Sequence, residues 1–490
     1  MTTLENLVRG LGARIEGDGD TPIAEICYDS RRISPGALFV ALRGSQTDGH
    51  RYASQARERG AAALLAEHVL PDLPRDFPAA YVHDTRAALP EVAARFFDRP
   101  GAAVDLIGVT GTNGKTSTVH MIESILAGAG YAVGSIGTIR VRGPGFEEPA
   151  ALTTPESVDL QRSLARMRDA GVRVVVLEVS SHSIALGRIR TLRFAVSVYT
   201  HLSQDHLDFH PDMDAYAATK AELFGPEYLE GTAVLNARDA LTPHLRERAE
   251  SVGRRVLTYG RGEDSPADVR TVSEQVELQG SKLRVRAPEG EVELALALAG
   301  DFQVENALAA AATASVLGID WDTIAGGLAS CPPIPGRLER VCDAEPIVLV
   351  DYAHTPDALD RVLASVRPLV RGRLITVFGC GGDRDRGKRA PMARAVCAHS
   401  DLCVATSDNP RSEDPHKILR DVAEGLSGAH EICVDRREAI RHAIGIADPE
   451  DVVVIAGKGH EDYQILGDKR VAFDDRIEAR RALEMRGDRA

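Results

Sequence analysis

Residues 104–117 read VDLIGVTGTNGKTS and join an apolar run to a glycine-bearing loop. The apolar residues 104–109 predict a strand, and the amphipathic residues 115–126 predict a helix that stops near Gly128. The same order continues along the chain, with further strands predicted at 172–179, 194–199 and 232–235. Strands that alternate with helices in this way are typical of a parallel sheet covered by helices. We therefore expect a doubly wound α/β domain around this segment.

The loop of this segment is suited to binding phosphate groups. Glycines let backbone N–H groups turn toward phosphate oxygens, and the N-terminus of the following helix adds its positive end. A lysine at position 115 can reach the β- and γ-phosphates, while the Thr116 hydroxyl can ligate Mg²⁺. The usual G-x4-G-K-[ST] spacing would place a glycine at Val109, whereas this chain has Gly108. Rather than a plain strand-to-helix turn, we predict a nucleoside triphosphate site formed by Gly111, Thr112, Asn113, Gly114, Lys115, Thr116 and Ser117.

Two further α/β units flank the central one. Before it, residues 37–42 and 61–66 predict strands, and residues 98–101 predict a break. After it come hairpin strands within 270–298, a helix at 304–317 and the proline-rich linker 331–336. Apolar runs at 347–350, 374–378, 402–405 and 452–455 then predict a third unit that resembles a Rossmann domain. The predicted α/β architecture has domains at 1–100, 101–335 and 336–490, the last two with mostly parallel sheets.

Composition narrows the class of protein. The chain has 490 residues, of which 44% are hydrophobic, so it can bury sizeable cores. Its 72 acidic residues outnumber 58 Lys and Arg, a net charge of −14 that argues against a nucleic-acid partner. The seven cysteines never form a CxxC pair, which argues against a zinc site or a disulfide framework and favours the cytoplasm. Because no apolar run reaches about 18 residues, we expect no membrane span. We also predict a monomer.

Three polar features of the central unit are candidates for metal binding or catalysis: one residue, one ten-residue run and one lysine. Glu178 ends the most apolar strand, where a carboxylate is costly unless it pairs with an arginine or binds a cation. The run HLSQDHLDFH at 201–210 holds three histidines and two aspartates, which suggests a metal or acid/base cluster without showing which members point inward. Lys220 lies in a mostly apolar predicted helix, where it could simply extend its ammonium to solvent.

These segments together resemble the Mur ligase family, which also includes the folylpolyglutamate synthetases. Its members use ATP to join an amine to a carboxylate. The resemblance rests on the phosphate loop with its early Gly108, on HLSQDHLDFH and on AATKAELF at 217–224. It implies that Thr116 and Glu178 bind one Mg²⁺, and that Glu178, His206 and Lys220 lie near a second. It further implies that Lys220 carries a CO₂-derived carbamate, that Lys115, Lys220 and His206 are catalytic, and that Asn306 and Arg337 contact ATP.

The resemblance also implies a nucleotide-sugar substrate. Segments near the start and in the central unit resemble those of family members that bind UDP-MurNAc-L-Ala-D-Glu. The corresponding positions in this chain are Tyr28, Ser30, Ser45, Gln46, Thr47, Thr153, Thr154, Ser180 and Arg188. A planar guanidinium such as that of Arg188 suits a carboxylate or a phosphate.

Late motifs indicate the amino acid that is added. The sequence DNPR at 408–411 resembles the signature of members that add meso-diaminopimelate, whose second α-amino acid centre bears a carboxylate that lysine lacks. The implied contacts are Arg389, Asp408, Asn409, Pro410, Arg411, Gly457 and Glu461. We therefore expect an ATP-dependent ligase of peptidoglycan precursor synthesis that forms an acyl phosphate on the D-Glu γ-carboxylate. A lysine-adding ligase, a folylpolyglutamate synthetase and a non-enzymatic nucleotide-binding scaffold are the alternatives.

Overall fold

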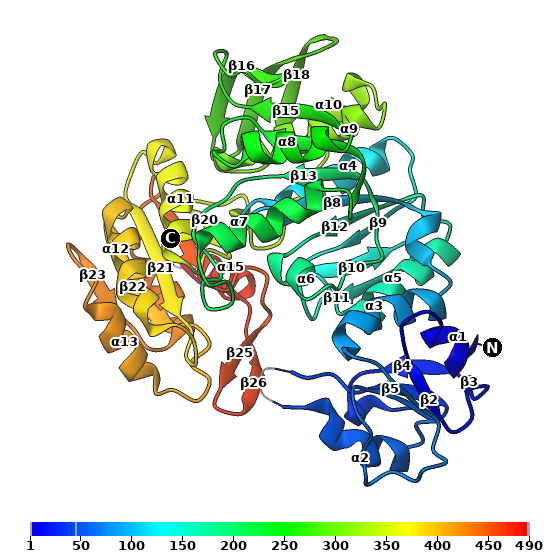
Figure 1. The fold of residues 1–490 in the computed structure, drawn as a ribbon. Helices are drawn as coiled ribbons and strands as arrows, with labels where there is room; N and C mark the ends of the chain where they lie inside the picture. Colours follow the sequence, from blue (N-terminus) through cyan, green and yellow to red (C-terminus); the bar gives the residue numbers. More distant parts are fainter. Residues whose placement is uncertain (1, 45–46, 488–490) are drawn as a thin grey trace.

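The computed structural model describes residues 2–44 and 47–487, which form three α/β units that follow one another along the chain (Figure 1). The N-terminal unit has a five-stranded sheet in the order β2-β7-β6-β5-β4, parallel except for β2. Its strands are β2 (Arg14–Glu16), β4 (Glu25–Cys27), β5 (Ala37–Val40), β6 (Ala63–Ala66) and β7 (Ala79–Tyr81). Its helices are α1 (Leu4–Val8), α2 (Ala53–Glu58) and α3 (Thr85–Phe96), and β1 (Thr2–Thr3) pairs with β3 (Pro22–Ile23).

The central unit is built on an eleven-stranded sheet in the order β11-β10-β9-β12-β8-β13-β14-β15-β16-β17-β18. The strands from β9 to β16 in that order run parallel, and an antiparallel hairpin extends each end. The parallel strands are β8 (Asp105–Thr110), β9 (Val133–Ile136), β12 (Val174–Glu178), β13 (Phe194–Tyr199), β14 (Leu229–Asn236), β15 (Arg255–Gly260) and β16 (Val269–Glu277). The end strands are β10 (Arg140–Gly143), β11 (Phe146–Pro149), β17 (Gly280–Ala287) and β18 (Gly290–Leu296).

Helices cover both faces of this sheet. On one face α4 (Lys115–Gly128), α9 (Phe302–Val316) and α10 (Trp321–Ala329) enclose an apolar core, and the opposite face has a second core with α5 (Ser157–Asp169) and α8 (Thr242–Ser251). Two shorter helices, α6 (Ser181–Ala185) and α7 (Met213–Ala221), follow strand ends. Every residue of β12 is buried, because a central parallel strand packs against helices on both sides.

The C-terminal unit has a six-stranded sheet in the order β19-β20-β24-β21-β22-β23, parallel except for β19. Its strands are β19 (Glu339–Arg340), β20 (Ile347–Asp351), β21 (Leu374–Cys380), β22 (Leu402–Ser407), β23 (His430–Ile432) and β24 (Val452–Ala456). Its helices are α11 (Pro356–Val366), α12 (Arg389–His399), α13 (Pro415–Ala423), α14 (Arg436–Gly445) and α15 (Asp475–Gly487), and β25 (Tyr463–Leu466) forms a hairpin with β26 (Lys469–Ala472).

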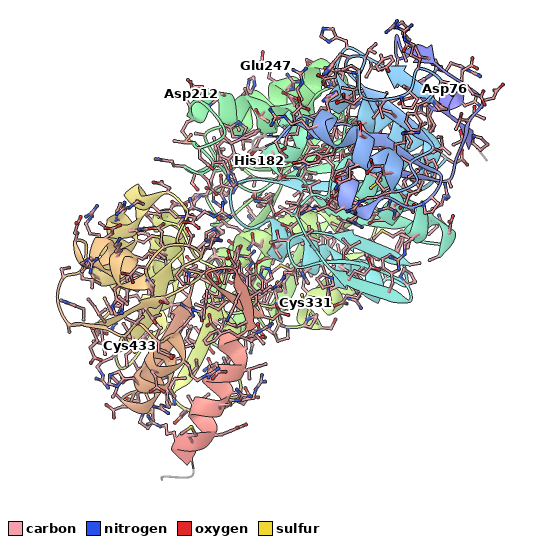
Figure 2. All side chains as sticks on the ribbon, turned by 90° about the horizontal axis from the view of Figure 1, so that it is seen from below. Asp76, His182, Asp212, Glu247, Cys331 and Cys433 are labelled. Carbon is pink, nitrogen blue, oxygen red and sulfur yellow. The ribbon has the colours of Figure 1, made fainter. Side chains whose placement is uncertain are left out.

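The architecture predicted from the sequence is confirmed: three α/β domains, the last two with mostly parallel sheets. Each sheet lies within one predicted range, while the domain limits themselves stay predictions. None of the helices in the described part of the chain is long and apolar enough to cross a membrane. All seven cysteines lie in the described residues and are free; Figure 2 shows Cys331 and Cys433 in different units.

Candidate active site

Strand order explains why distant motifs meet. The parallel strands β12, β8 and β13 are neighbours, with Glu178 beside Val109 and Tyr199 beside Thr110 in register. Their carboxyl ends therefore lie at one edge of the sheet, where the phosphate loop, Glu178 and the segment 201–210 all begin. The predicted convergence of these three motifs follows from topology alone.

The phosphate loop has the backbone that its glycines permit. Gly111 has a φ of +147° and Gly114 a φ of +86°, both in a region that other residues rarely adopt. A Cβ at Gly111 would collide with the Thr200 side chain. The Lys115 ammonium donates hydrogen bonds to the carbonyls of Gly111 at 2.9 Å and Thr112 at 2.8 Å. The loop is thus already folded around its lysine.

Glu178 is the buried carboxylate of this edge. Its side chain accepts hydrogen bonds from the Thr116 hydroxyl at 3.0 Å, the Thr138 backbone N–H at 2.8 Å and the Thr138 hydroxyl at 2.9 Å. No cationic side chain of the described residues lies within salt-bridge distance of it, so the arginine pairing considered as an alternative is not formed. The arrangement leaves a buried negative charge beside the phosphate loop.

Lys220 is buried rather than extended to solvent, with 1% of its surface exposed. Its ammonium donates to the Gly111 carbonyl at 2.9 Å and lies 4.5 Å from the centroid of the Tyr216 ring. Burial, reinforced by the Lys115 charge, holds the pKa of Lys220 well below its ordinary value. Among the described residues no carboxylate forms an ion pair with it.

His206 lies at the same edge of the sheet and has a φ of +55°. Its Nε2 is 3.5 Å from an Asp205 carboxylate oxygen, and its ring centroid is 4.8 Å from that of His182. Burial lowers the pKa of His206. In the described residues no three His, Cys, Asp or Glu side chains are grouped to hold a metal ion by themselves.

A cavity of about 290 Å³ opens between the central and C-terminal units. The central unit contributes the phosphate loop, Glu178, His206 and Asn306 to its lining, and the C-terminal unit contributes Arg337, Tyr352 and His354. Arg337 donates to the Thr116 hydroxyl at 3.2 Å, and its guanidinium carbon lies 5.0 Å from the Tyr352 ring centroid. Asn306 donates to Gln303 at 2.9 Å. All predicted ATP contacts thus line one cavity or, for Gly111, the loop beside it.

Sequence reasoning gave no role to three side chains of this region. Thr138 fixes both oxygens of Glu178, and Tyr216 lies under the Lys220 ammonium. Asp357 on α11 accepts hydrogen bonds from Ser203 at 2.8 Å and Asn113 at 3.4 Å and so joins the two units. Thr138 and Asp357 act through partners distant in sequence, whereas Tyr216 lies one helical turn before Lys220.

The predicted nucleotide-sugar contacts of the central unit form a cluster. The Thr154 hydroxyl donates to the Glu178 carbonyl at 2.7 Å, and the Arg188 guanidinium donates to the Thr154 carbonyl at 3.1 Å. Thr153 is linked through Thr138 at 3.1 Å to the Glu178 carboxylate. Ser180 caps the start of α6 and accepts from the Ser183 N–H.

The N-terminal positions are more dispersed. Tyr28 donates to Asp159 of the central unit at 2.5 Å, Ser30 donates to Gln55 at 3.2 Å, and Thr47 contacts Tyr52 at 3.1 Å. Ser45 and Gln46 lie outside the described residues.

The DNPR segment follows β22 in the C-terminal unit. The Arg411 backbone bonds to β25, and its guanidinium donates to the Gly382 carbonyl at 2.7 Å. Asn409 donates to a Glu461 carboxylate oxygen at 2.9 Å. Gly457 has a φ of +119°, which L side chains rarely adopt, and a Cβ there would lie 2.8 Å from the Asp408 carboxylate. The predicted amino-acid contacts 408–411, Gly457 and Glu461 are therefore neighbours.

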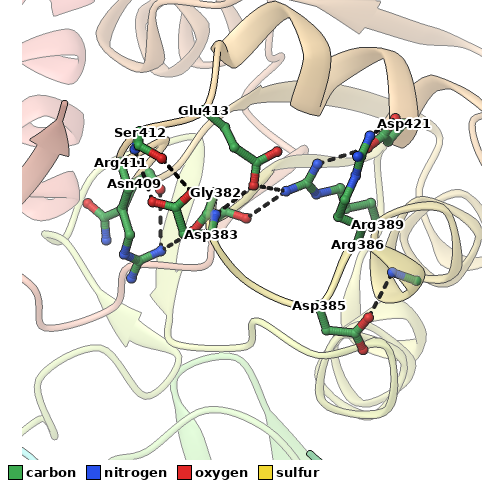
Figure 3. Close-up of polar contacts among 12 residues, drawn as sticks. Gly382, Asp383, Asp385, Arg386, Arg389, Asn409, Arg411, Ser412, Glu413 and Asp421 are labelled. Carbon is green, nitrogen blue, oxygen red and sulfur yellow. Dashed lines mark hydrogen bonds and ion pairs between the residues drawn. The ribbon is translucent and has the colours of Figure 1, made fainter. Parts of the chain in front are cut away.

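Arg389 differs from Arg411 in its surroundings. Its side chain is 1% exposed, and its guanidinium donates to Glu413 and to Asp421, each at 2.8 Å (Figure 3). Glu413 also accepts from the Asp383 N–H at 2.6 Å, and Asp383 accepts from Ser412 at 2.7 Å. Arg389 thus supports the DNPR loop through Glu413, which follows it in the chain. Direct contact between Arg389 and an amino-acid substrate stays a prediction.

Replacing Arg389 by methionine should destabilise the C-terminal unit by about 2 kcal/mol, less than for a fully buried pair because both carboxylates keep access to water. The hydrogen bond from Arg389 lowers the pKa of Glu413 and of Asp421. A carboxyl whose pKa is lowered in the folded state stabilises the fold at pH values above its unfolded-state pKa. The difference in free energy of unfolding between variant and wild type should therefore be full at pH 7 and shrink as the pH falls below about 4.

Hydrogen exchange in α12 and α13 measures this difference. The control is Arg394→Met, which removes an exposed arginine from the same helix. Equal protection of wild type and Arg389→Met at pH 7 would contradict the expectation.

The fold and site define a protein in which a phosphate-loop domain faces a second α/β domain across one cavity. Family models match as follows: Mur ligase family, catalytic domain, at 22–97; Mur ligase middle domain at 109–314; Mur ligase, glutamate ligase domain, at 336–459. The chain belongs to the Mur ligase family.

Among its relatives is the UDP-N-acetylmuramoyl-L-alanyl-D-glutamate–2,6-diaminopimelate ligase of Geobacillus kaustophilus, 43% identical over 97% of this chain and 98% of that protein. The ligase of the same name from Gloeobacter violaceus is 43% identical over 99% of each chain. A solved structure of a ligase with that name has a TM-score of 0.70 and 32% identity and covers 99% of each chain.

Proposed function

We propose that this chain is the ATP-dependent ligase that adds meso-2,6-diaminopimelate to the D-Glu γ-carboxylate of UDP-N-acetylmuramoyl-L-alanyl-D-glutamate, a step of peptidoglycan precursor synthesis. The names of near-full-length relatives at 43% identity support it. The observation that carries the proposal is the cavity where the phosphate loop faces the domain that bears DNPR. That the protein is located in the cytoplasm and is a monomer stays a prediction.

The proposed reaction has the two steps that the family resemblance implies. The γ-carboxylate attacks the γ-phosphorus of ATP, the bond to ADP breaks, and an acyl phosphate forms. The amine of diaminopimelate then attacks the acyl carbon, an amide forms, and phosphate leaves with a proton lost from the amine. Lys115 can turn from its loop carbonyls toward the phosphoryl oxygens, and Arg337 adds positive charge from the opposite wall.

The donor set fits Mg²⁺, which prefers oxygen ligands and keeps waters or substrate phosphates in its shell. Thr116 and Glu178 would hold the first ion, because the Thr116 hydroxyl already lies against the Glu178 carboxylate. That carboxylate is buried and has no cationic partner in the described residues. The ion would offset the repulsion between two anionic substrates.

Lys220 would help to hold a second Mg²⁺ as a carbamate formed with CO₂, near Glu178 and His206. Its buried ammonium lies against the phosphate loop without a carboxylate partner in the described residues, which favours conversion to an anion there.

The substrate assignments extend this proposal. Thr153, Thr154, Ser180 and Arg188 would bind the nucleotide-sugar dipeptide together with the N-terminal positions Tyr28, Ser30 and Thr47. The segment 408–411, with Gly457 and Glu461, would bind diaminopimelate: Arg411 suits its second carboxylate, and Glu461 suits an ammonium.

One assay separates the alternatives. The purified chain is supplied with ATP, Mg²⁺ and the nucleotide-sugar dipeptide, and phosphate release and product mass are compared for diaminopimelate, lysine and glutamate. We expect turnover with diaminopimelate and a kcat/KM about 10³-fold lower with lysine. Bound lysine has no second carboxylate, so the Arg411 guanidinium would be left without its partner. Preferential use of lysine or of glutamate, or no turnover at all, would contradict the proposal.

A further inference from the structure

A second fully buried lysine, Lys458, lies in the C-terminal unit and has no role in the reaction described above. It follows β24 in the loop 457–461, and its side chain is 0% exposed. Its ammonium donates to a Glu461 oxygen, Oε2, at 2.9 Å and to Asn409 Oδ1 at 3.2 Å. It also lies 5.3 Å from the centroid of the Tyr463 ring. Because burying an ammonium is costly, these partners must be held in place around it.

The contacts of Glu461 are unequal. Its Oε2 accepts from both Lys458 and the Asn409 side-chain amide, the latter at 2.9 Å. Asn409 is fixed in turn, since its Oδ1 also accepts from the Ile465 N–H at 3.0 Å. In the described residues no hydrogen bond reaches Oε1, and the Glu461 side chain is 17% exposed. One carboxylate oxygen is therefore held by two donors, while the other has no hydrogen-bond partner in the described residues.

We propose that Lys458 is a positioning residue of the amino-acid site, which locks Glu461 Oε2 so that Oε1 is presented to the ammonium of the incoming amino acid. This inference rests on the proposed function. Lys458 acts only through Glu461 and Asn409, and its ammonium holds the Glu461 carboxylate in one orientation before the substrate arrives. A lysine that only stabilised the fold would lower the unfolding temperature when it is replaced, without a selective rise in KM for diaminopimelate.

The test compares Lys458→Met, Glu461→Gln and the double variant by steady-state kinetics with each substrate varied in turn. We expect Lys458→Met to raise KM for diaminopimelate at least about 10-fold, with KM for ATP and for the nucleotide-sugar dipeptide changed less than about twofold. Because Lys458 acts through Glu461, the double variant should bind diaminopimelate no more weakly than Glu461→Gln alone. The control is Lys469→Met on the exposed strand β26, which should leave all three KM values unchanged.

Two results would overturn the inference: an unchanged KM for diaminopimelate in Lys458→Met, or losses that multiply in the double variant. If Lys458→Met fails to fold, Lys458→Leu, which also removes the donor to Glu461, takes its place with the same expected selectivity. Failure of both to fold would assign Lys458 to stability alone and would likewise overturn it. Absence of turnover by the wild type with diaminopimelate would instead count against the proposed function.

Discussion

Lys115→Met should lower kcat for ATP-dependent phosphate release by about 10³-fold or more, because phosphoryl transfer depends mainly on fixed positive charge around the developing phosphate. Its ammonium already lies within the loop, on the Gly111 and Thr112 carbonyls. Burial lowers the pKa of Lys115, and the nearby Glu178 and Asp205 charges oppose this effect. Methionine keeps the length and packing of the side chain while it removes the charge.

Initial rates of phosphate release with all three substrates measure this effect. Lys282→Met is a suitable control, because Lys282 is exposed on β17 in the same unit. Thermal unfolding of both variants should match the wild type. A Lys115→Met protein that retained more than about a tenth of the wild-type kcat would contradict the assignment of the loop as the phosphate site.

Lys220→Ala should lower kcat by about 10²-fold or more, and short carboxylates such as formate or acetate should restore part of the activity. The alanine leaves space beside Tyr216 that a small anion can fill, so added carboxylate would replace the oxygen atoms of the proposed carbamate. The measurement is the rate of phosphate release against carboxylate concentration, with Lys115→Met as the matched variant that carboxylates should not restore.

Two outcomes would count against the carbamate. Full activity of Lys220→Ala without any additive would show that this lysine is not needed. Equal stimulation of Lys220→Ala and Lys115→Met by carboxylates would show a general salt effect rather than local replacement.

Much of the fold could be predicted from the sequence, because the strands are short apolar runs that end at glycine-bearing loops. The strand predicted at 194–199 is β13 with the same limits, and the predicted helix at 115–126 is α4, which ends at Gly128. The loosely alternating stretch 270–298 was harder to interpret, and it forms three strands that extend the central sheet. Helix α2 begins only at Ala53, because residues 49–52 form a 3₁₀ turn.

The site was less accessible to sequence reasoning wherever a residue acts through a distant partner. Lys115, Glu178 and Lys220 stand in motifs, and their convergence follows from the adjacency of β12, β8 and β13. The sequence also contains Lys458 within AGKGHED but cannot show that its ammonium meets Asn409, which lies 49 residues earlier. Arg389 illustrates the opposite case: a residue that a motif marks as a ligand is occupied by two protein carboxylates.

The central claim is that the chain couples ATP cleavage to amide formation through an acyl phosphate. The most direct test supplies nucleotide-sugar dipeptide labelled with ¹⁸O in the D-Glu γ-carboxylate, together with ATP and diaminopimelate, and measures the mass of the released phosphate. We predict that each phosphate carries one labelled oxygen and that one amide forms for each ATP consumed. Unlabelled phosphate, or ATP consumption without an amide product, would contradict the account.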